Sequence, residues 1–143
     1  MNKKNLMIPI FFGFIACSWM PHWSCHYYRL ETHSSFIVGN FNFSNFDSWI
    51  FMMIYSLLIG MNLVSISYAN VRYYTALSSG ILHFVLAIIH IIRIFKPFTF
   101  VVFGFDWSMG SSLREIIVLF FLGALCFIVS TTLKGKGDKN IMQ

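Results

Sequence analysis

Charged side chains are scarce in this sequence. Among its 143 residues, Asp, Glu, Lys and Arg together make up 10%, and only five of them are acidic. A soluble domain carries about 25% charged residues, so this chain has too little charge to cover a water-facing surface. Hydrophobic residues reach 57%, and the mean hydropathy is +0.71. That balance also excludes intrinsic disorder, which needs the opposite composition, and it predicts an integral membrane protein.

Basic residues gather at the two ends of the chain, whose net charge is +5. Lys3 and Lys4 open it, and Lys134, Lys136 and Lys139 close it. Lysines beside apolar segments are typical of cytoplasmic flanks and contact anionic lipid headgroups. Because no basic stripe with interleaved aromatic residues lies outside the apolar segments, we expect the lipid bilayer as a partner and no nucleic acid.

Four apolar segments approach the ~17–25 residues that a membrane-spanning helix needs. They cover residues 5–20, 48–68, 74–95 and 115–133. The sequence therefore predicts an all-α membrane protein with four transmembrane helices in a single domain, residues 1–143, ending in a basic tail at 134–143. The first segment also fits a cleaved signal peptide, which has such lysines and apolar residues before a site like Ala16-Cys17-Ser18. Trp19 and Trp23 favour a retained span, because tryptophans anchor helices at the membrane interface.

The orientation follows from the basic residues. With both termini inside, six basic residues face the inner side and four the outer side. This bias predicts that both termini are cytoplasmic, and we expect the bacterial inner (plasma) membrane. Residues 69–73 then form a very short inner connection, so the second and third spans should make an antiparallel hairpin.

The two outer connections, residues 21–47 and 96–114, show apolar–polar alternation. The clearest examples are Phe36-Ile37-Val38 and Phe41-Asn42-Phe43-Ser44. Alternation of this kind is typical of strands. We therefore predict a small β-like outer cap, with residues 31–34 turning one strand back on the next.

An internal repeat appears when the sequence is shifted by 64 residues. Residues 26–44 then share six identities in nineteen positions with residues 90–108. The identities include His26 with His90 and Arg29 with Arg93, and Ser48 also coincides with Ser112. Histidine and arginine are scarce here, so these matches favour a duplication with halves at residues 1–68 and 69–133. Both halves would run in the same direction, about an axis along the membrane normal.

The repeated His-x-x-Arg pairs are the strongest candidate site. A spacing of three puts both side chains on one helical face, and ionisable groups inside a membrane protein are costly and usually functional. His26, Arg29, His90 and Arg93 are therefore predicted to bind a ligand, since the arginine fork matches phosphate or carboxylate groups. The alternative is that the arginines snorkel to the membrane interface.

Histidines and sulfur residues raise a cofactor hypothesis, although no cofactor is predicted. His83 and His90 lie seven residues apart, so on one helical face they could be axial ligands of two haems, each needing a further ligand from another helix. A second group suits copper or zinc by its soft and imidazole ligands, although its spacing matches no strong metal motif. It comprises Cys17, Met20, His22 and Cys25, with His83 as a further member.

A Cys17–Cys25 disulfide is the plainer use of two of these residues if the outer compartment is oxidising. Pro21 would help to reverse the chain between the two cysteines. Cys126, within the fourth span, is expected to be buried and inert. Asn62 is the one strongly polar amide in a span, and it suits an interhelical hydrogen bond.

Motifs of known enzymes are missing from the sequence. It has no phosphate-binding loop, no Gly-x-Ser-x-Gly, no His-Glu-x-x-His and no Cys-x-x-Cys, and no nucleophile lies beside a base. We therefore expect a non-enzymatic protein. Asp47-Ser48 and Ser111-Ser112 are predicted to cap the second and fourth spans.

In its size, predicted span count and basic ends, the chain resembles the small inner-membrane immunity proteins that protect bacteria from pore-forming toxins. That resemblance is architectural and rests on no motif. It implies a helper, assembly or protective factor that contacts a membrane partner, another protein or its own copy, through its helices and outer cap. The alternative function is a ligand-binding redox (haem or copper) or lipid-handling subunit that uses the His-x-x-Arg pairs.

Overall fold

The structure is a computed structural model, and it describes residues 3–32, 36–38, 41–43, 45–97, 101–102, 105–106 and 108–141. Helices make up most of this part of the chain. Three of them are long and apolar enough to cross a membrane, at Asp47–Ser67, Ala69–Phe95 and Gly110–Lys134. They coincide with the last three predicted spans and are consistent with an integral membrane protein.

The first predicted span is helix α1 (Lys3–Ser18), which has only 16 residues and is not among those three helices. After Trp19 a second helix, α2 (Met20–Glu31), continues the chain. The prediction that the chain becomes extended from residue 21 is therefore wrong. Pro21 lies in the first turn of α2, where a missing N–H costs no helical hydrogen bond, so it helps to start a helix and does not reverse the chain.

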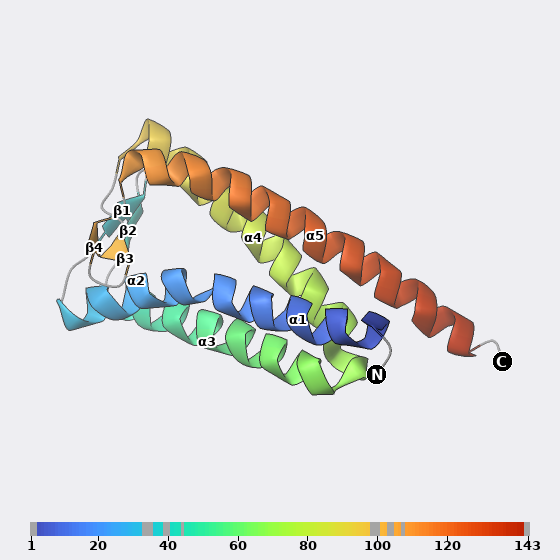
Figure 1. Cartoon of the computed structure of the whole chain (residues 1–143). Helices are drawn as coiled ribbons and strands as arrows, with labels where there is room; N and C mark the ends of the chain where they lie inside the picture. The colour runs from blue at the N-terminus through green and yellow to red at the C-terminus, as the bar shows by residue number, and fades with distance from the viewer. Residues whose placement is uncertain are drawn as a thin grey trace.

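The remaining helices complete two layers (Figure 1). Helix α3 (Asn45–Ser67) runs beside α1 and α2, and helix α5 (Met109–Ile141) packs along α4 (Arg72–Phe95). The short 3-10 helix η1 (Ala69–Val71) joins α3 to α4. It lies at the end of the molecule where both termini are found, opposite the strands. From this connection α3 and α4 diverge, so the predicted hairpin is splayed.

Two short antiparallel ladders lie at the other end of the molecule. Strand β1 (Phe36–Val38) pairs with β2 (Phe41–Phe43), and β3 (Val101–Val102) pairs with β4 (Phe105–Asp106). Because Val38 pairs with Phe41, the reversal from β1 to β2 lies between these two residues. The turn predicted at residues 31–34 precedes β1, and residues 33 and 34 lie outside the described residues. The ladders contact the opposite layer, β1 against α4 and β3 against α2.

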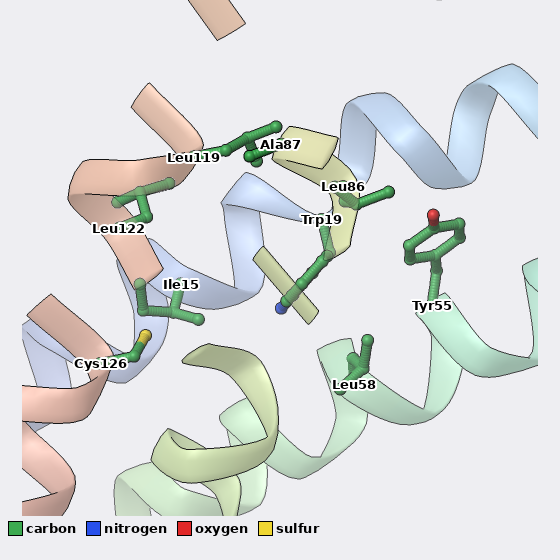
Figure 2. Packing of buried hydrophobic residues seen from close by; sticks show 9 residues of the cluster. All are labelled: Ile15, Trp19, Tyr55, Leu58, Leu86, Ala87, Leu119, Leu122 and Cys126. Carbon is green, nitrogen blue, oxygen red and sulfur yellow. The ribbon is translucent and has the colours of Figure 1, made fainter. Parts of the chain in front are cut away.

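The hydrophobic core joins the two layers. Trp19 is fully buried between them, close to Tyr55 and Leu58 of α3 and to Leu86 of α4 (Figure 2). The expectation that Trp19 is an interfacial anchor is therefore wrong, because its side chain is fully buried in the core. The rest of the core comes from α1, α4 and α5, through Ile15, Ala87, Leu119, Leu122 and Cys126.

Helices α4 and α5 approach closely at two glycines. A Cβ atom added to Gly80 would lie 3.2 Å from Cys126 Cβ, and one added to Gly123 would lie 2.9 Å from the Phe84 ring. Small residues at a helix interface allow such close packing in membranes. Cys126, as expected, is buried in this interface.

This close packing predicts that Gly123→Ala lowers the free energy of unfolding by about 1 kcal/mol, the low end of the cost of overpacking. The Phe84 ring must shift by a few tenths of an ångström to admit the methyl group. Gly60→Ala is the matched control, because a Cβ at Gly60 meets nothing within 4 Å. Unfolding in mixed micelles measures both variants, and equal stability would contradict the tight contact.

Candidate functional site

A layer of buried polar side chains lies toward the strand end of the bundle. We call five of them the His–Arg centre. It consists of His22, His26 and Arg29 on α2 with His90 and Arg93 on α4. All five have less than a tenth of their surface exposed.

Helical periodicity brings these side chains inward. On α2, positions 22, 26 and 29 repeat at spacings of four and three residues, so they share one face. On α4, positions 83, 90 and 93 lie seven and three residues apart, so they also share one face. The buried face of α2 is therefore polar, which explains why an analysis by hydrophobicity missed this helix.

Burial decides between the two interpretations of the His-x-x-Arg pairs. Arg29 is 4% exposed and Arg93 is 3% exposed, whereas a snorkelling arginine keeps its guanidinium in water. The snorkelling alternative is therefore wrong for both residues. The side chains are held inside the protein, where a cation must be stabilised by hydrogen bonds or by an opposite charge.

Between α4 and α5, Ser112 of α5 completes a small network. Its Oγ lies 3.3 Å from His90 Nδ1 and accepts a hydrogen bond from Arg93 Nη1. Ser112 is fully buried. The sequence predicted this serine as a helix cap, but α5 begins earlier, and the Ser111 N–H hydrogen-bonds to Ser108 Oγ at 3.3 Å.

Between α2 and α3, aromatic rings pack against the histidines. The ring of His26 stacks on Phe51 and Tyr55, with centroid distances of 4.8 and 5.7 Å. His22 stacks on Tyr55 and meets His90 edge-on, each at 5.9 Å. His22 therefore links α2 to both α3 and α4, and the sequence predicted neither this role nor the contribution of Tyr55.

His83 is held deeper in the bundle by both ring nitrogens. Nε2 lies 3.0 Å from Ser18 Oγ, Nδ1 lies 2.7 Å from the Ser79 carbonyl oxygen, and the ring lies 4.1 Å from that of Trp19. Because haem iron binds an imidazole through a free nitrogen, this arrangement does not favour His83 as an axial ligand.

The predicted metal group is dispersed. Cys17 and Met20 are exposed, whereas His22 and Cys25 are buried. Within the described part of the chain, no three His, Cys, Asp or Glu side chains are placed to hold a metal ion. The structure thus lends no support to the copper or zinc hypothesis.

The predicted Cys17–Cys25 disulfide is absent, and both cysteines are free thiols. They lie on α1 and α2, and eight residues of helix separate them by roughly 12 Å. A disulfide needs Cα atoms within about 7 Å of each other. The prediction is wrong because it assumed a reversing loop where the chain is helical.

Polar contacts also join α3 to α4 below the centre. Asn62 Nδ2 donates to Ser79 Oγ at 3.0 Å, and Ser65 Oγ donates to Thr75 Oγ1 at 2.9 Å. The prediction of an interhelical hydrogen bond from Asn62 is confirmed. The Ser65–Thr75 pair was not foreseen, because hydroxyl residues are common in spans and carry little signal alone.

Comparison with protein-family models, curated proteins and solved structures finds no match to this chain.

Proposed function

We propose that this chain is a non-enzymatic integral membrane protein that binds an anionic group at the His–Arg centre, between two similar halves. The burial of both Arg29 and Arg93 is the observation that carries the proposal. Ionisable groups inside a membrane protein are retained at a cost and are usually functional. Arginine forks and imidazole N–H groups are donors, so the ligand they suit is an oxyanion such as a phosphate or a carboxylate.

The proposed duplication is supported by the element boundaries. Helices α2 and α4 end at Glu31 and Phe95, which are 64 residues apart, and α3 and α5 begin at Asn45 and Met109, also 64 apart. The same shift relates His26 to His90, Arg29 to Arg93 and Ser48 to Ser112, all of them buried. Ligand sites of transporters with such repeats lie between the repeats, which is where His22 meets His90.

Thermal unfolding of the full-length protein in a neutral detergent tests this function. We expect inorganic phosphate, or phosphatidylglycerol added to the micelles, to raise the Tm of the wild type with increasing concentration, because a ligand of the folded state stabilises it. Phosphate is compared with chloride at equal ionic strength. The double variant Arg29→Gln/Arg93→Gln should lose the shift.

The exposed Arg114 provides the control, since Arg114→Gln makes the same type of substitution, with the loss of one positive charge, outside the centre. It should keep the full shift. If neither probe raises the Tm of the wild type, or if Arg114→Gln loses as much as the double variant, the centre is not an anion site.

Four membrane crossings with both termini in the cytoplasm are the topology we propose, in the bacterial inner membrane. In its support, the termini and η1 lie at one end of the molecule and the strands at the other (Figure 1). Helices α1 and α2 together would make the fourth crossing.

Reporter fusions test this topology. Those after Lys139 and within residues 69–73 should report a cytoplasmic position, and those at Ser34 and Phe103 an external one. An internal signal at Ser34, or mature protein that lacks the first segment, would reduce the crossings to three.

A second candidate function is contact with a membrane partner, as a helper, assembly or protective factor. The outer face of α3 supports it, because this face carries an open apolar groove of about 830 Å³. The groove is lined by Trp49, Ile50, Met52, Met53, Ile54, Ser56 and Leu57. A charged substitution there, such as Met53→Glu, should abolish this function and leave the phosphate-dependent Tm shift intact.

A further inference from the structure

The two halves of the site differ in one respect that bears on the ligand. In the second half the Ser112 hydroxyl is bonded within the protein, to His90 Nδ1 and Arg93 Nη1. The equivalent Ser48 hydroxyl is equally buried, yet it hydrogen-bonds to no protein group that the structure describes. Buried hydroxyls are almost always hydrogen-bonded, so Ser48 has a donor to offer to something else.

Ser48 belongs to the face of α3 that meets α2. Phe51 and Tyr55 follow it at spacings of three and four residues and stack on His26. Since α2 and α3 are antiparallel neighbours, Arg29, one turn beyond His26, comes level with the first turns of α3, where Ser48 lies. A buried hydroxyl, imidazole and guanidinium therefore lie at a similar level where α2 and α3 meet.

Each half has one half-buried acidic residue close to its serine in sequence, at a position that is not acidic in the other half. Residue 115, in the second half, is a half-buried glutamate, and its counterpart 64 positions earlier is Phe51. A carboxylate repels an incoming anion, and it does so more strongly in a medium of low dielectric. In the first half the nearest acidic residue in sequence is Asp47, also half-buried, one residue before Ser48.

We infer that Ser48, His26 and Arg29 bind one phosphate group in the first half, where the Ser48 hydroxyl has a hydrogen bond to donate, whereas the Ser112 hydroxyl of the second half is already bonded within the protein. The phosphate belongs either to a lipid headgroup or to a small soluble compound. This inference rests on the function proposed above, and it places the ligand of the His–Arg centre in the first half. Ser48 donates to a phosphate oxygen, Arg29 supplies the fixed positive charge, and His26 is held in place by its stacked rings.

The experiment compares two probes on the full-length protein: inorganic phosphate in neutral detergent, and nanodiscs containing phosphatidylglycerol against nanodiscs of phosphatidylcholine alone. Stabilisation of the wild type by phosphate alone identifies a soluble ligand, and stabilisation by phosphatidylglycerol alone identifies a headgroup. In either case Ser48→Ala should weaken the apparent affinity at least tenfold. Ser112→Ala, the matched variant of the second half, should keep an affinity within about twofold of the wild type after correction for its lower stability.

Asp47→Asn should change the affinity for phosphate in the opposite direction. Removing the acidic charge beside Ser48 should strengthen phosphate binding severalfold, which a merely structural role of Ser48 would not produce. The inference is overturned if Ser48→Ala binds like the wild type, if Ser112→Ala loses affinity equally, or if Asp47→Asn fails to strengthen binding. Absence of any stabilisation of the wild type would instead refute the proposed function itself.

Discussion

Replacing Trp19 with alanine is expected to lower the free energy of unfolding by about 3–5 kcal/mol, the usual cost of truncating a fully buried aromatic residue. Its indole lies 4.1 Å from the His83 ring and 5.9 Å from the Tyr55 ring, so one side chain packs against both layers. Alanine would leave a cavity where α1 and α2 meet the rest of the core (Figure 2). Loss of dispersion contacts, rather than transfer from water, is the main cost inside a membrane protein.

Trp49→Ala is the matched control. Trp49 is 57% exposed, whereas Trp19 is 0% exposed. The same substitution on the outer face of α3 should change stability by less than about 0.5 kcal/mol. Denaturation by SDS in mixed micelles measures both. Equal losses, or a Trp19 variant as stable as the wild type, would place Trp19 outside the core and contradict the packing of the halves.

Hydropathy alone located the three long helices. The predicted span at residues 48–68 differs from the observed Asp47–Ser67 by one residue at each end, because composition changes sharply where a span meets polar loops. The start of α5 was missed by six residues, 115 against Met109, since its first turns are Ser- and Gly-rich and resemble a loop. The hydropathy of a sequence does not reveal the polar first turns of a helix that precede its apolar residues.

Helix α2 shows the limit of that reasoning. Its buried face carries His22, Ser24, Cys25, His26 and Arg29, which a membrane-based analysis assigns to an aqueous loop. The helical spacing of these residues was present in the sequence, and it would have indicated a helix had polar residues been allowed to face inward. The error in α2 also produced the incorrect disulfide, because Cys17 and Cys25 can approach only around a loop.

The pairing of sequence positions 64 residues apart identified the candidate site, but not the roles of its serines. Ser48 and Ser112 were interpreted as caps, which is the usual use of serine near a helix start. The structure begins both helices three residues earlier, at Asn45 and Met109, and buries both hydroxyls. The two hydroxyls differ in which neighbouring side chains lie within hydrogen-bonding distance. The periodicity of the sequence does not predict those contacts.

The two serines should therefore respond differently to the same substitution. Ser112→Ala removes the acceptor of Arg93 Nη1 and the partner of His90 Nδ1. A hydrogen bond to a charged group contributes about 1.5–3 kcal/mol, well above the ~0.6 kcal/mol average of interhelical hydrogen bonds in a membrane protein. We expect the free energy of unfolding to fall by about 1.5–3 kcal/mol when measured without phosphate or anionic lipid.

Ser48→Ala removes a buried hydroxyl that forms no hydrogen bond with the described protein groups. Deleting an unsatisfied polar group costs nothing in hydrogen bonding and can stabilise the fold. Under the same conditions its free energy of unfolding should match or exceed that of the wild type. The two positions are equivalent in the proposed repeat and equally buried, so helix propensity and cavity size should cancel between them. Equal losses in both variants would mean that Ser48 is bonded as Ser112 is, and the two halves would then be alike in role as well as in position.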